Sequence, residues 1–587
     1  MFDSVTPKIF SVLTQLQRRR AAALVGLMLV GMALETLGVG LVIPAIALLT
    51  GRDFAATYPG IQPWLKLLGN PTDSTIVVVG LLALTAVFIV KTAFLAFLAW
   101  KQSRLVFGIQ AELSQRLFAT YLRQPYPFFL QRNSAQLIQN VIIEVTQFAS
   151  QALTPALVIM TEGFLLLGLT VLLLVVEPVG AIVVISVTGA VSWAFHRTTS
   201  TLVSRWGASR QHHEGLRIQY LQQGLGAAKD VKLLGREADF LERYREHNTE
   251  SARAGGSLLT VVQLPRLGLE LLSVVGLTTL VLTMMLQGRS MAQVVPALGL
   301  FGAAAYRLMP SVNRALSAAP SLRFAAPVVS RLLEELSLPA SVATPSQTRT
   351  APFRTVIELT HVSFTYPGAP GPALDDVSVS IARGESIGVI GPSGSGKSTL
   401  IDILLGLLAP SVGEVKVDGE SIWSNLRAWQ DHLGYVPQVI YLTDDSIRRN
   451  VAFGLADEQI DDVAVGRAIK AAQLEEFVST LPQGIETFVG ERGVRLSGGQ
   501  RQRIGMARAL YHDPAVLVLD EATSALDTAT ERDIMEAVKA LQREKTVVIV
   551  AHRLSTVEHC RRLYRLEQGR VVEAGEPSAL TGLESIQ

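Results

Sequence analysis

The sequence is poor in charged residues and nearly free of cysteine. Only 17% of its 587 residues are Asp, Glu, Lys or Arg, whereas 49% are hydrophobic. A soluble domain typically carries about 25% charged residues, so this deficit excludes a disordered chain and argues against a purely water-soluble one. The single cysteine, Cys560, excludes an intramolecular disulfide framework. Basic and acidic residues nearly balance, 52 against 50, and this balance provides no basic field for nucleic acid.

The hydrophobic residues are concentrated before residue 320, in six apolar runs. About 20 helical residues cross the hydrocarbon core of a membrane, and a buried soluble core would give one or two such runs rather than six. The sequence therefore predicts an all-α domain of six transmembrane helices. The predicted spans are 21–49, 75–100, 153–176, 178–195, 267–286 and 291–310.

Basic residues predict the orientation of these spans. Arg18, Arg19 and Arg20 precede the first span, and many Lys and Arg residues occupy 101–152 and 196–266. Because basic loops stay on the cytoplasmic side, both long loops and the N-terminus are expected there. Six spans then return the C-terminal half to the cytoplasm. The helical periodicity of the two loops predicts that membrane helices continue into the cytoplasm.

Composition divides the chain into four parts. Residues 1–20 are expected to form an elbow helix at the membrane interface, and 21–335 the transmembrane domain. The Pro-, Ser- and Thr-rich stretch 336–354 is the predicted linker. In 355–587, strand-like and helix-like runs alternate, which predicts an α/β domain with a largely parallel core sheet. The expected strands include 356–366, 377–381, 386–390, 516–519 and 546–550.

A phosphate-binding loop is the most specific motif of this second half. Residues 391–398 read GPSGSGKS and match the pattern GxxxxGK[ST], between a predicted strand and a predicted helix. The glycines let successive backbone N–H groups face phosphate oxygens. Lys397 would supply a positive charge to the β- and γ-phosphates, and the Ser398 hydroxyl would bind Mg²⁺.

Two further motifs follow in a fixed order. Residues 496–500 read LSGGQ at the start of a predicted helix, where backbone N–H groups favour an anion. Residues 516–521 read VLVLDE, a buried strand that ends in two carboxylates. Asp520 is the candidate magnesium-side carboxylate, and Glu521 is the candidate base that polarises the attacking water. A helix N-cap with an acidic first turn would explain either carboxylate alone, but not both beside the phosphate loop.

In this order the motifs resemble the ATP-binding cassette, and the whole chain is similar to an ABC exporter half-transporter of the type IV class. The resemblance implies that Tyr366 stacks on adenine, that Gln438 senses Mg²⁺, that Asp527 belongs to the D-loop and that His552 contacts the γ-phosphate. Glu521, His552 and Lys397 form the implied catalytic set, and Ser398, Gln438 and Asp520 the implied Mg²⁺ ligands. The implied ATP contacts are Tyr366, Gly391, Ser393, Gly394, Ser395, Gly396, Lys397, Ser398, Thr399, Gln438, Ser497, Gly498, Gly499, Gln500 and Asp527.

The same resemblance implies a homodimer, because the LSGGQ segment of one protomer closes over ATP held by the other. A heterodimer with a degenerate partner is the alternative. Force is expected to pass through turns near 125–133 and 224–231 of the cytoplasmic loops. The resemblance also places the chain in the bacterial inner membrane as a multi-pass protein.

Ionisable residues within the spans are candidates for binding the transported molecule, because a buried charge in a membrane is costly. Lys91, Arg266 and Arg307 would suit an anionic phosphate or pyrophosphate headgroup. The alternative is that they pair with Glu35, Glu162 and Glu270 as structural contacts.

A finer resemblance concerns the transported molecule. Residues 34–44 (LETLGVGLVIP) and 437–445 are similar to bacterial flippases of lipid-linked oligosaccharides. This similarity implies ATP-driven flipping of a polyprenyl-pyrophosphate-linked oligosaccharide by alternating access. The alternatives are a lipid A-like lipid, a hydrophobic drug, and a channel or regulatory subunit that ATP gates.

Overall fold

The structure is a computed structural model that describes residues 2–41, 73–176, 178–286, 291–339, 353–522, 528–542, 544–551 and 553–579. The chain forms two compact units. The first consists of Met1–Gln124 and Gln131–Ala340, and the second of Pro125–Leu130 and Ser341–Gln587. The short piece at Pro125 therefore belongs with the C-terminal half, although its flanks belong to the first unit.

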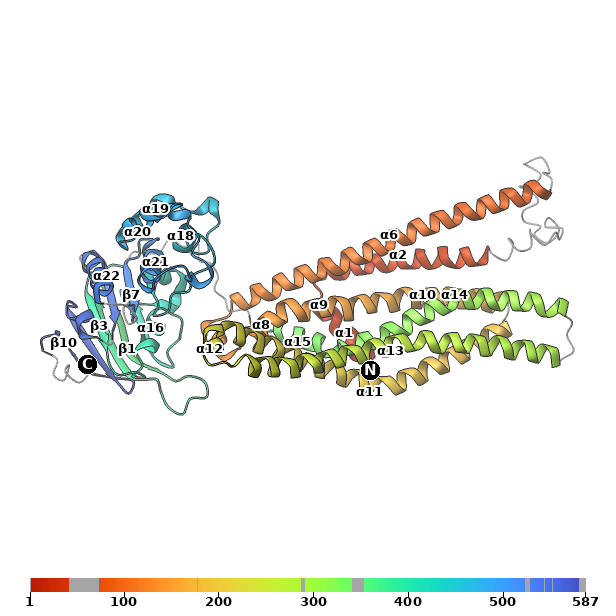
Figure 1. Ribbon diagram of the computed structural model, residues 1–587, viewed down its shortest axis with the longest axis horizontal. Helices are drawn as coiled ribbons and strands as arrows, with labels where there is room; N and C mark the ends of the chain where they lie inside the picture. The colour runs from red at the N-terminus through yellow and green to blue at the C-terminus, as the bar shows by residue number, and fades with distance from the viewer. Residues whose placement is uncertain are drawn as a thin grey trace. The chain divides into compact units, whose positions relative to one another are not determined.

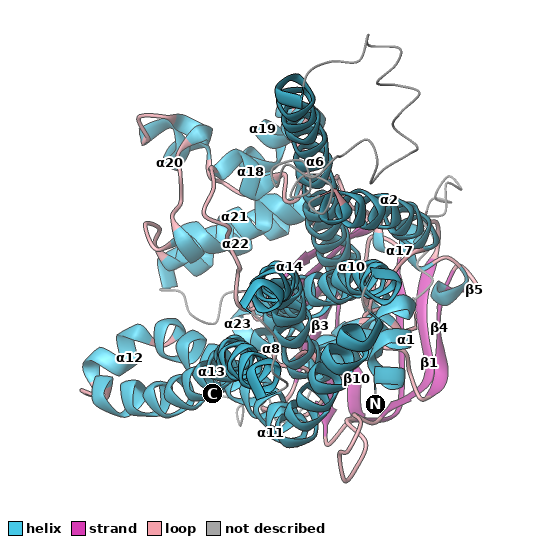
Figure 2. Cartoon of the chain, turned by 90° about the vertical axis from the view of Figure 1, so that its right-hand side faces the viewer, coloured by secondary structure: helices cyan, strands magenta, loops and turns pink. Residues whose placement is uncertain are grey.

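The first unit is helical throughout its described residues, and long helices run alongside one another in Figures 1 and 2. Packed pairs include α2 with α6, α2 with α10, α10 with α14 and α11 with α13. Its helices are α1 (Phe2–Val12), α2 (Gln15–Gly40), α6 (Asp73–Leu122), α8 (Ser134–Ile138), the π-helix η2 (Gln139–Glu144), α9 (Val145–Gln147), the π-helix η3 (Phe148–Leu153), α10 (Thr154–Val176), α11 (Pro178–Gly226), α12 (Ala228–Leu233), α13 (Glu237–Leu286), α14 (Met291–Phe324) and α15 (Ala326–Leu336).

Several helices are much longer than the spans predicted from hydropathy. Helices α6 and α13 each have 50 residues and α11 has 49. At a rise of 1.5 Å per residue, 50 residues extend about 75 Å, more than twice the hydrocarbon thickness. The spans 75–100, 178–195 and 267–286 are therefore sections of helices that extend into the loop regions 101–152 and 196–266, as their periodicity predicted.

Four helical segments among the described residues are long and apolar enough to cross a membrane: Gln15–Gly40, Thr75–Leu122, Ser134–Val175 and Glu237–Gly276. The predicted spans 178–195 and 291–310 are the first parts of α11 and α14. The structure does not describe some of the side chains in these two segments. Residues 42–49 of the first predicted span, the linker residues 340–352 and the external amphipathic segment expected near Trp64 also lie outside the described residues.

The helical segment expected over residues 1–20 is interrupted in the structure. The chain breaks after α1 and starts α2 at Gln15. Thr14 stops continuation of the first helix, because its hydroxyl accepts from the Gln17 backbone N–H while the Gln17 side chain accepts from the Thr14 N–H. This reciprocal capping box satisfies two backbone donors at the start of α2. The apolar periodicity across this boundary concealed the cap.

The second unit contains two sheets, and β1, β2, β3, β7 and β8 lie close to the five predicted strands. A six-stranded sheet has the order β10-β9-β3-β8-β7-β6, and a four-stranded antiparallel sheet the order β2-β1-β4-β5. In the larger sheet only β10 pairs antiparallel. The strands are β1 (Val356–Phe364), β2 (Leu374–Ala382), β3 (Ser386–Ile390), β4 (Val412–Val417), β5 (Glu420–Ser421), β6 (Leu433–Val436), β7 (Val516–Asp520), β8 (Thr546–Val550), β9 (Arg562–Glu567) and β10 (Arg570–Gly575).

The helices of this unit are mostly short. They are α7 (Tyr126–Gln131), α16 (Lys397–Leu404), α17 (Leu426–Gln430), α18 (Ile447–Val451), α19 (Asp462–Ala471), α20 (Glu475–Thr480), α21 (Gly498–Leu510), α22 (Thr528–Leu541) and α23 (Leu554–Val557). The pairing of the antiparallel sheet and the helices α18, α19 and α20 between β6 and α21 were not predicted, because short amphipathic runs leave their pairing open.

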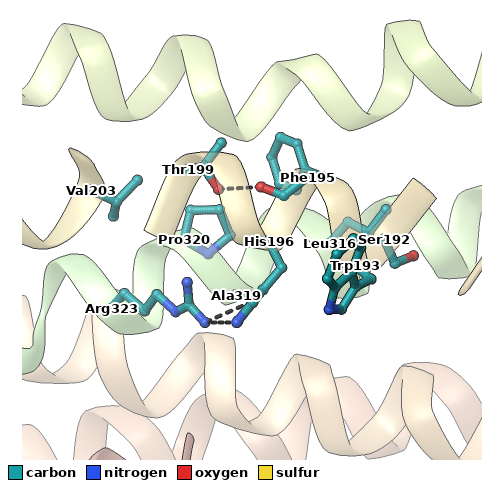
Figure 3. Close-up of a pocket in the computed structure, with 10 residues that line it drawn as sticks. All are labelled: Ser192, Trp193, Phe195, His196, Thr199, Val203, Leu316, Ala319, Pro320 and Arg323. Atoms are coloured by element: carbon teal, nitrogen blue, oxygen red, sulfur yellow. Dashed lines mark hydrogen bonds between the residues drawn. The ribbon is translucent and has the colours of Figure 1, made fainter. Parts of the chain in front are cut away.

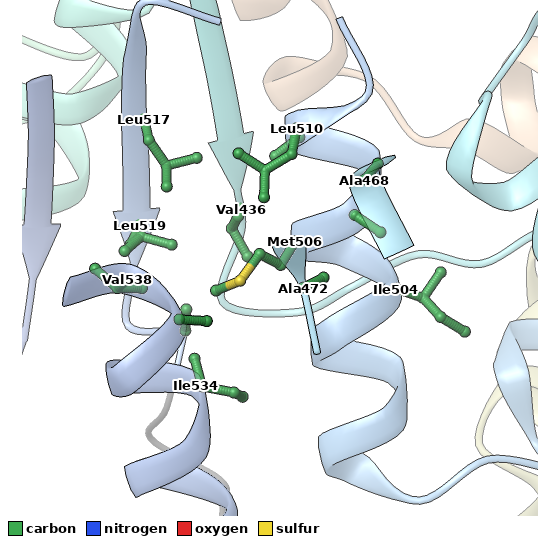
Figure 4. Close-up of a cluster of buried hydrophobic side chains, with 14 of the residues drawn as sticks. Val436, Ala468, Ala472, Ile504, Met506, Leu510, Leu517, Leu519, Ile534 and Val538 are labelled. Atoms are coloured by element: carbon green, nitrogen blue, oxygen red, sulfur yellow. The ribbon is translucent and has the colours of Figure 1, made fainter. Parts of the chain in front are cut away.

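Buried parallel strands explain why the motif-bearing segments are continuous apolar runs. Every residue of β3, β7 and β8 is buried, because both faces of the sheet are covered. Leu517 and Leu519 of β7 pack into one core cluster with residues of α21 and α22 such as Met506 and Ile534 (Figure 4). Val516 and Val518 face the other cluster. Two packed faces thus hold β7 rigidly and fix the position of the carboxylates at its end.

Candidate functional site

The phosphate-binding loop connects the buried strand β3 to α16, as the motif predicts. Its glycines have backbone angles that other residues rarely adopt, with φ of +78° at Gly394 and +102° at Gly396. A Cβ atom at Gly396 would lie 2.6 Å from the carbonyl oxygen of Ala373, and one at Gly391 2.2 Å from that of Leu566. Glycine is therefore required both for the turn and for its close packing against the sheet.

Polar groups inside this loop fit a phosphate chain. Lys397 is buried, and its Nζ donates to the carbonyl oxygens of Gly391 and Pro392 at 2.8 and 3.0 Å. The Ser395 hydroxyl is buried and has no hydrogen-bond partner among the described residues, a condition that a ligand oxygen would relieve. Ser393, Gly394 and Ser398 are exposed. The loop thus offers exposed donors around a buried ammonium group.

The carboxyl ends of neighbouring strands bring the other predicted residues to the same edge of the sheet. Strand β8 lies between β3 and β7, and β6 follows β7. Asp520 ends β7, Glu521 follows it, and Gln438 lies two residues beyond β6. The Gln438 Nε2 atom donates to Glu521 Oε2 at 2.6 Å, and the Tyr435 hydroxyl lies 3.4 Å from Asp520 Oδ2. Ligands of open α/β sheets bind at this edge.

The charges at this edge influence one another. Burial lowers the pKa of Lys397, and the nearby Glu521 and Asp520 carboxylates partly oppose that shift. Burial, together with the charge of Asp520, raises the pKa of Asp402 in α16 to about 6. The edge is therefore an ionic site with an excess of carboxylates, which a metal cation would balance.

Hard oxygen donors of the kind that Mg²⁺ prefers are present at this site. Ser398 offers a hydroxyl, Gln438 an amide and Asp520 a carboxylate. Within the described ranges there is no group of three or more His, Cys, Asp or Glu side chains placed to hold a metal by themselves. Mg²⁺ characteristically takes one or two carboxylates and completes its shell with phosphates and water, so this donor set fits it.

The LSGGQ segment caps the first turn of α21. The Ser497 hydroxyl accepts from the Gln500 backbone N–H at 3.2 Å, and the Gln500 side chain accepts from the Ser497 N–H at 2.8 Å. Ser497 is exposed and Gly499 is buried. Between 497–500 and the phosphate-binding loop at 391–399, the described residues form no hydrogen bond or ion pair. The structure thus brings the loop, the carboxylates and Gln438 together, but it does not add this segment to them.

Tyr366 is half-buried beside the phosphate-binding loop. Its hydroxyl lies 3.2 Å from the Thr399 hydroxyl, and its ring makes an edge contact with Phe364. The hydroxyl end of the ring thus contacts the start of α16, and stacking on a base stays a prediction. Asp527 and His552 lie outside the described residues, so their predicted roles are untested.

The ionisable residues of the predicted spans differ in burial and in their partners. Lys91 and Glu35 are both buried and form an ion pair at 3.2 Å, and Gly38 leaves room for the Lys91 stem. Glu162 pairs with Arg314, a residue that the sequence did not single out. These contacts match the structural alternative for the two glutamates and for Lys91. Arg266 and Glu270 are exposed in the chain, and the Arg307 side chain is outside the description.

A pocket between α11 and α14 contains basic residues that the sequence reasoning missed. It is about 270 Å³ in volume and is lined by apolar groups of Trp193, Phe195, Leu316 and Pro320 (Figure 3). At one side, Arg323 donates to His196 at 2.7 Å. The pocket lies where the predicted fourth span ends. A histidine directly after the fourth apolar run, close to a tryptophan, was the available sequence signal, whereas Arg323 lies several turns beyond the sixth run.

This architecture, together with a nucleotide-type site at the edge of the parallel sheet, defines a membrane transporter driven by a cassette ATPase. Residues 374–524 match the ABC transporter family, and residues 36–286 match the ABC transporter transmembrane region. The chain belongs to the ABC transporter family. It couples ATP hydrolysis to transport, so the predicted fold and reaction are confirmed.

The similar proteins include named flippases. The chain is 32% identical over 508 residues to the ATP-dependent lipid A-core flippase of Dechloromonas aromatica, covering 85% of each chain. It is 31% identical over 566 residues to the flippase of the same name from Nitrosococcus oceani, covering 92% of this chain and 91% of the relative. A bacterial Atm1-family ABC exporter solved with ATP bound shares the fold, with a TM-score of 0.79 and 23% identity over 98% of both chains.

Proposed function

We propose that the chain flips a lipid A-type glycolipid, an acylated and phosphorylated amphiphile, across the bacterial inner membrane. The observation that carries this proposal is the 32% identity to a lipid A-core flippase over 85% of both chains. Lipid A-type lipids are the alternative in the sequence analysis, and the relatives favour them over polyprenyl-pyrophosphate-linked oligosaccharides. Both cargo classes carry anionic phosphate on long apolar tails.

The working unit is a homodimer with composite ATP sites. The phosphate-binding loop, Asp520, Glu521 and Gln438 meet at one sheet edge of a single chain, whereas the LSGGQ segment makes no described contact there. A second chain would supply Ser497, Gly498, Gly499 and Gln500 to complete each site. Lys397, Glu521 and His552 are the proposed catalytic residues, and Asp527 lies at the proposed junction between the two sites.

Magnesium would be held by Ser398, Gln438 and Asp520 together with ATP oxygens. When bound, the ion supplies positive charge that stabilises the transferring phosphoryl group. Lys397 binds the β- and γ-phosphates, Tyr366 stacks on the base, and Glu521 orients and deprotonates the attacking water. The N-terminus and the ATPase half are proposed to be cytoplasmic, because the basic residues lie in 101–152 and 196–266.

The pocket between α11 and α14 supports an anionic lipid as cargo. Arg323 and His196 form a polar corner beside an apolar wall, so a phosphate group and the start of an acyl chain fit side by side. Arg266 and Arg307 remain proposed headgroup contacts. Lys91 is the weakest of the proposed contacts, because binding cargo would require it to leave its ion pair with Glu35.

ATP hydrolysis by the protein reconstituted in proteoliposomes tests the cargo. Lipid A is expected to raise the rate several-fold in the wild type and much less in Arg323→Ala, with the exposed Arg245→Ala as the control variant. Dephosphorylated lipid A and a polyprenyl-pyrophosphate glycan are the comparison lipids. Stimulation by the glycan alone would favour lipid-linked oligosaccharide as cargo, and hydrolysis indifferent to all three lipids would contradict the proposed cargo.

A further inference from the structure

Glu335 is a fully buried carboxylate in α15, the last described helix before the linker. It accepts a hydrogen bond from the Tyr121 hydroxyl at 3.0 Å and one from Arg132 Nη1 at 2.6 Å. Arg331, one turn earlier on the same helix, lies 3.3 Å from it. The four side chains Tyr121, Arg132, Arg331 and Glu335 are called the Glu335 clamp below.

Two members of the clamp flank one short helix. Tyr121 lies in the last turn of α6, and Arg132 follows directly after α7. Pro125–Leu130 belongs with the cassette unit, whereas the residues on either side belong with the membrane unit. Glu335 therefore fixes both points at which the chain leaves the membrane unit for α7 and returns from it.

Further hydrogen bonds connect the same two points to η2 and to Pro339, beside the linker. Asn140, a buried residue of the π-helix η2, donates to the Tyr121 hydroxyl at 2.9 Å. Gln124 donates to the carbonyl oxygen of Pro339 at 3.0 Å, close to the start of the linker. Burial, together with the charges of Asp402 and Tyr366, raises the pKa of Tyr126 in α7. Tyr126 of α7 thus feels the charges of Asp402 and Tyr366 in the same unit, while Tyr121 and Arg132, which flank α7, are bound to Glu335 of α15.

Stability alone does not account for a buried carboxylate with two arginines. Replacing such a group by well-packed apolar residues is often neutral or stabilising, because the desolvation of the charges offsets their attraction. The Tyr121 hydroxyl donates to Glu335 and accepts from Asn140, so both partners fix its orientation. A network of this kind has one defined geometry, and it therefore holds its helices in a fixed relation to one another.

We propose that Glu335 is a positioning residue that couples the ATP site to the membrane helices by holding both ends of α7 to α15. A displacement of α7 when ATP binds then moves α6, η2 and α15 as one body. Without the carboxylate, α7 moves with the cassette, whereas α6, η2 and α15 do not follow it. This inference rests on the proposed homodimer and deepens the expectation that force passes through residues 125–133.

The test compares Glu335→Gln with Glu334→Gln in the full-length dimer. Glu334 is the matched control, since it neighbours Glu335 on α15 and also pairs with Arg331, at 3.6 Å, but its side chain is largely exposed whereas that of Glu335 is buried. A spin label at Val175→Cys, an exposed position near the end of α10, reports the distance between protomers in a Cys560→Ser background. The readouts are the distance shift on trapping with ATP and vanadate, the basal kcat, the KM for ATP and the melting temperature.

In the wild type and in Glu334→Gln the distance should shift on trapping. In Glu335→Gln the shift should fall by more than half, with basal kcat and KM within about twofold of wild type. An unchanged shift in Glu335→Gln would overturn the proposal. A parallel fall of shift, kcat and melting temperature would also overturn it, since that pattern indicates a structural role only.

Tyr121→Phe covers the case in which Glu335→Gln does not fold, because it removes one hydroxyl and leaves both charges. A reduced shift at an unchanged melting temperature is expected, and a wild-type shift would contradict the clamp. A wild type without any shift would overturn the proposed transport cycle and the clamp with it. If only the proposed cargo is wrong, the wild type should still show the distance shift, because trapping with ATP and vanadate needs no lipid A.

Discussion

Gln438 and Glu521 are hydrogen-bonded to each other at 2.6 Å across the ends of two adjacent strands, β6 and β7. Glu521 also has a left-handed backbone, with φ of +49°, which costs about 1 kcal/mol or more in a residue with a side chain. One side chain is the proposed magnesium ligand and the other the proposed base. This hydrogen bond holds the Glu521 carboxylate in place in the nucleotide-free protein. It would have to rearrange for Gln438 to bind Mg²⁺ beside ATP.

Replacing Gln438 by Ala should separate nucleotide binding from hydrolysis. The substitution removes the hydrogen bond to Glu521 and one proposed magnesium ligand, so hydrolysis of MgATP should fall about 10-fold or more. Binding of ATP measured in the presence of a chelator should be unchanged. Gln430→Ala, which removes a 3.4 Å hydrogen bond to the Leu405 carbonyl, is the control and should hydrolyse normally. Equal rates in the two variants would contradict the role of Gln438.

Ser497 and Ser446 are both helix N-caps, and their comparison isolates the function of the LSGGQ segment. Each hydroxyl accepts from a backbone N–H three residues on, at 3.2 and 3.3 Å. Losing either cap should cost about 1 kcal/mol of stability. Only Ser497→Ala should also lower the hydrolysis rate beyond that loss and weaken the ATP-dependent association of cassettes. Equal loss of activity in both variants at equal melting temperature would argue against a composite site.

The ion pair between Lys91 and Glu35 predicts a compensating double variant. Lys91→Met removes the ammonium group that pairs with the buried Glu35 carboxylate and should destabilise the protein by about 3–5 kcal/mol, whereas Lys91→Met with Glu35→Gln should regain most of that loss. Thermal unfolding of the detergent-purified protein measures both. Transport that recovers with stability assigns Lys91 a structural role. Recovered stability without transport would instead support contact with the cargo.

Asp402 predicts a pH dependence of stability in the nucleotide-free protein. Its pKa is raised from 3.8 to about 6 by burial and by Asp520, so the folded state holds a proton that the unfolded state has released. The resulting stabilisation is fully present below pH 3.8 and is lost as the pH rises through 6. Because the group is partly exposed, we expect a loss of about 1–2 kcal/mol.

Asp402→Asn cannot ionise, so its stability should not fall across this window as that of the wild type does. Thermal melts at pH 4.5, 5.5 and 6.5 provide the comparison. Parallel pH profiles for the two proteins would show that the Asp402 carboxyl titrates normally.

The sequence predicted the cassette core well because its motifs are attached to buried strands. Ser386–Ile390 and Thr546–Val550 are strands with the predicted bounds, since continuous apolar runs between polar turns have one simple interpretation. The sheet then brings Asp520, Glu521 and Gln438 to the phosphate-binding loop through strand order alone. Local pattern defines each strand, and the parallel sheet determines which ends meet.

The sequence did not predict which charged residues pair when they lie far apart in the chain. The partners of Glu162 and Glu335 are Arg314 and Arg132, which lie 152 and 203 residues away in sequence. The break between α1 and α2 was missed because a capping box at Thr14 overrides a continuous apolar stripe. The pocket beside Arg323 depends on how α11 packs against α14, and hydropathy does not encode that packing.

ATP-driven movement of lipid A between leaflets of reconstituted vesicles tests the central claim most directly. A quencher added outside the vesicles reports how much of the fluorescent lipid lies in the outer leaflet. Wild type, Glu521→Gln and the exposed control Glu558→Gln are compared in parallel. We predict translocation in the wild type and in Glu558→Gln that requires Mg²⁺ and ATP, and a loss of about 100-fold or more in Glu521→Gln with ATP binding retained. Translocation that proceeds equally in Glu521→Gln, or equally without ATP, would contradict an ATP-driven flippase.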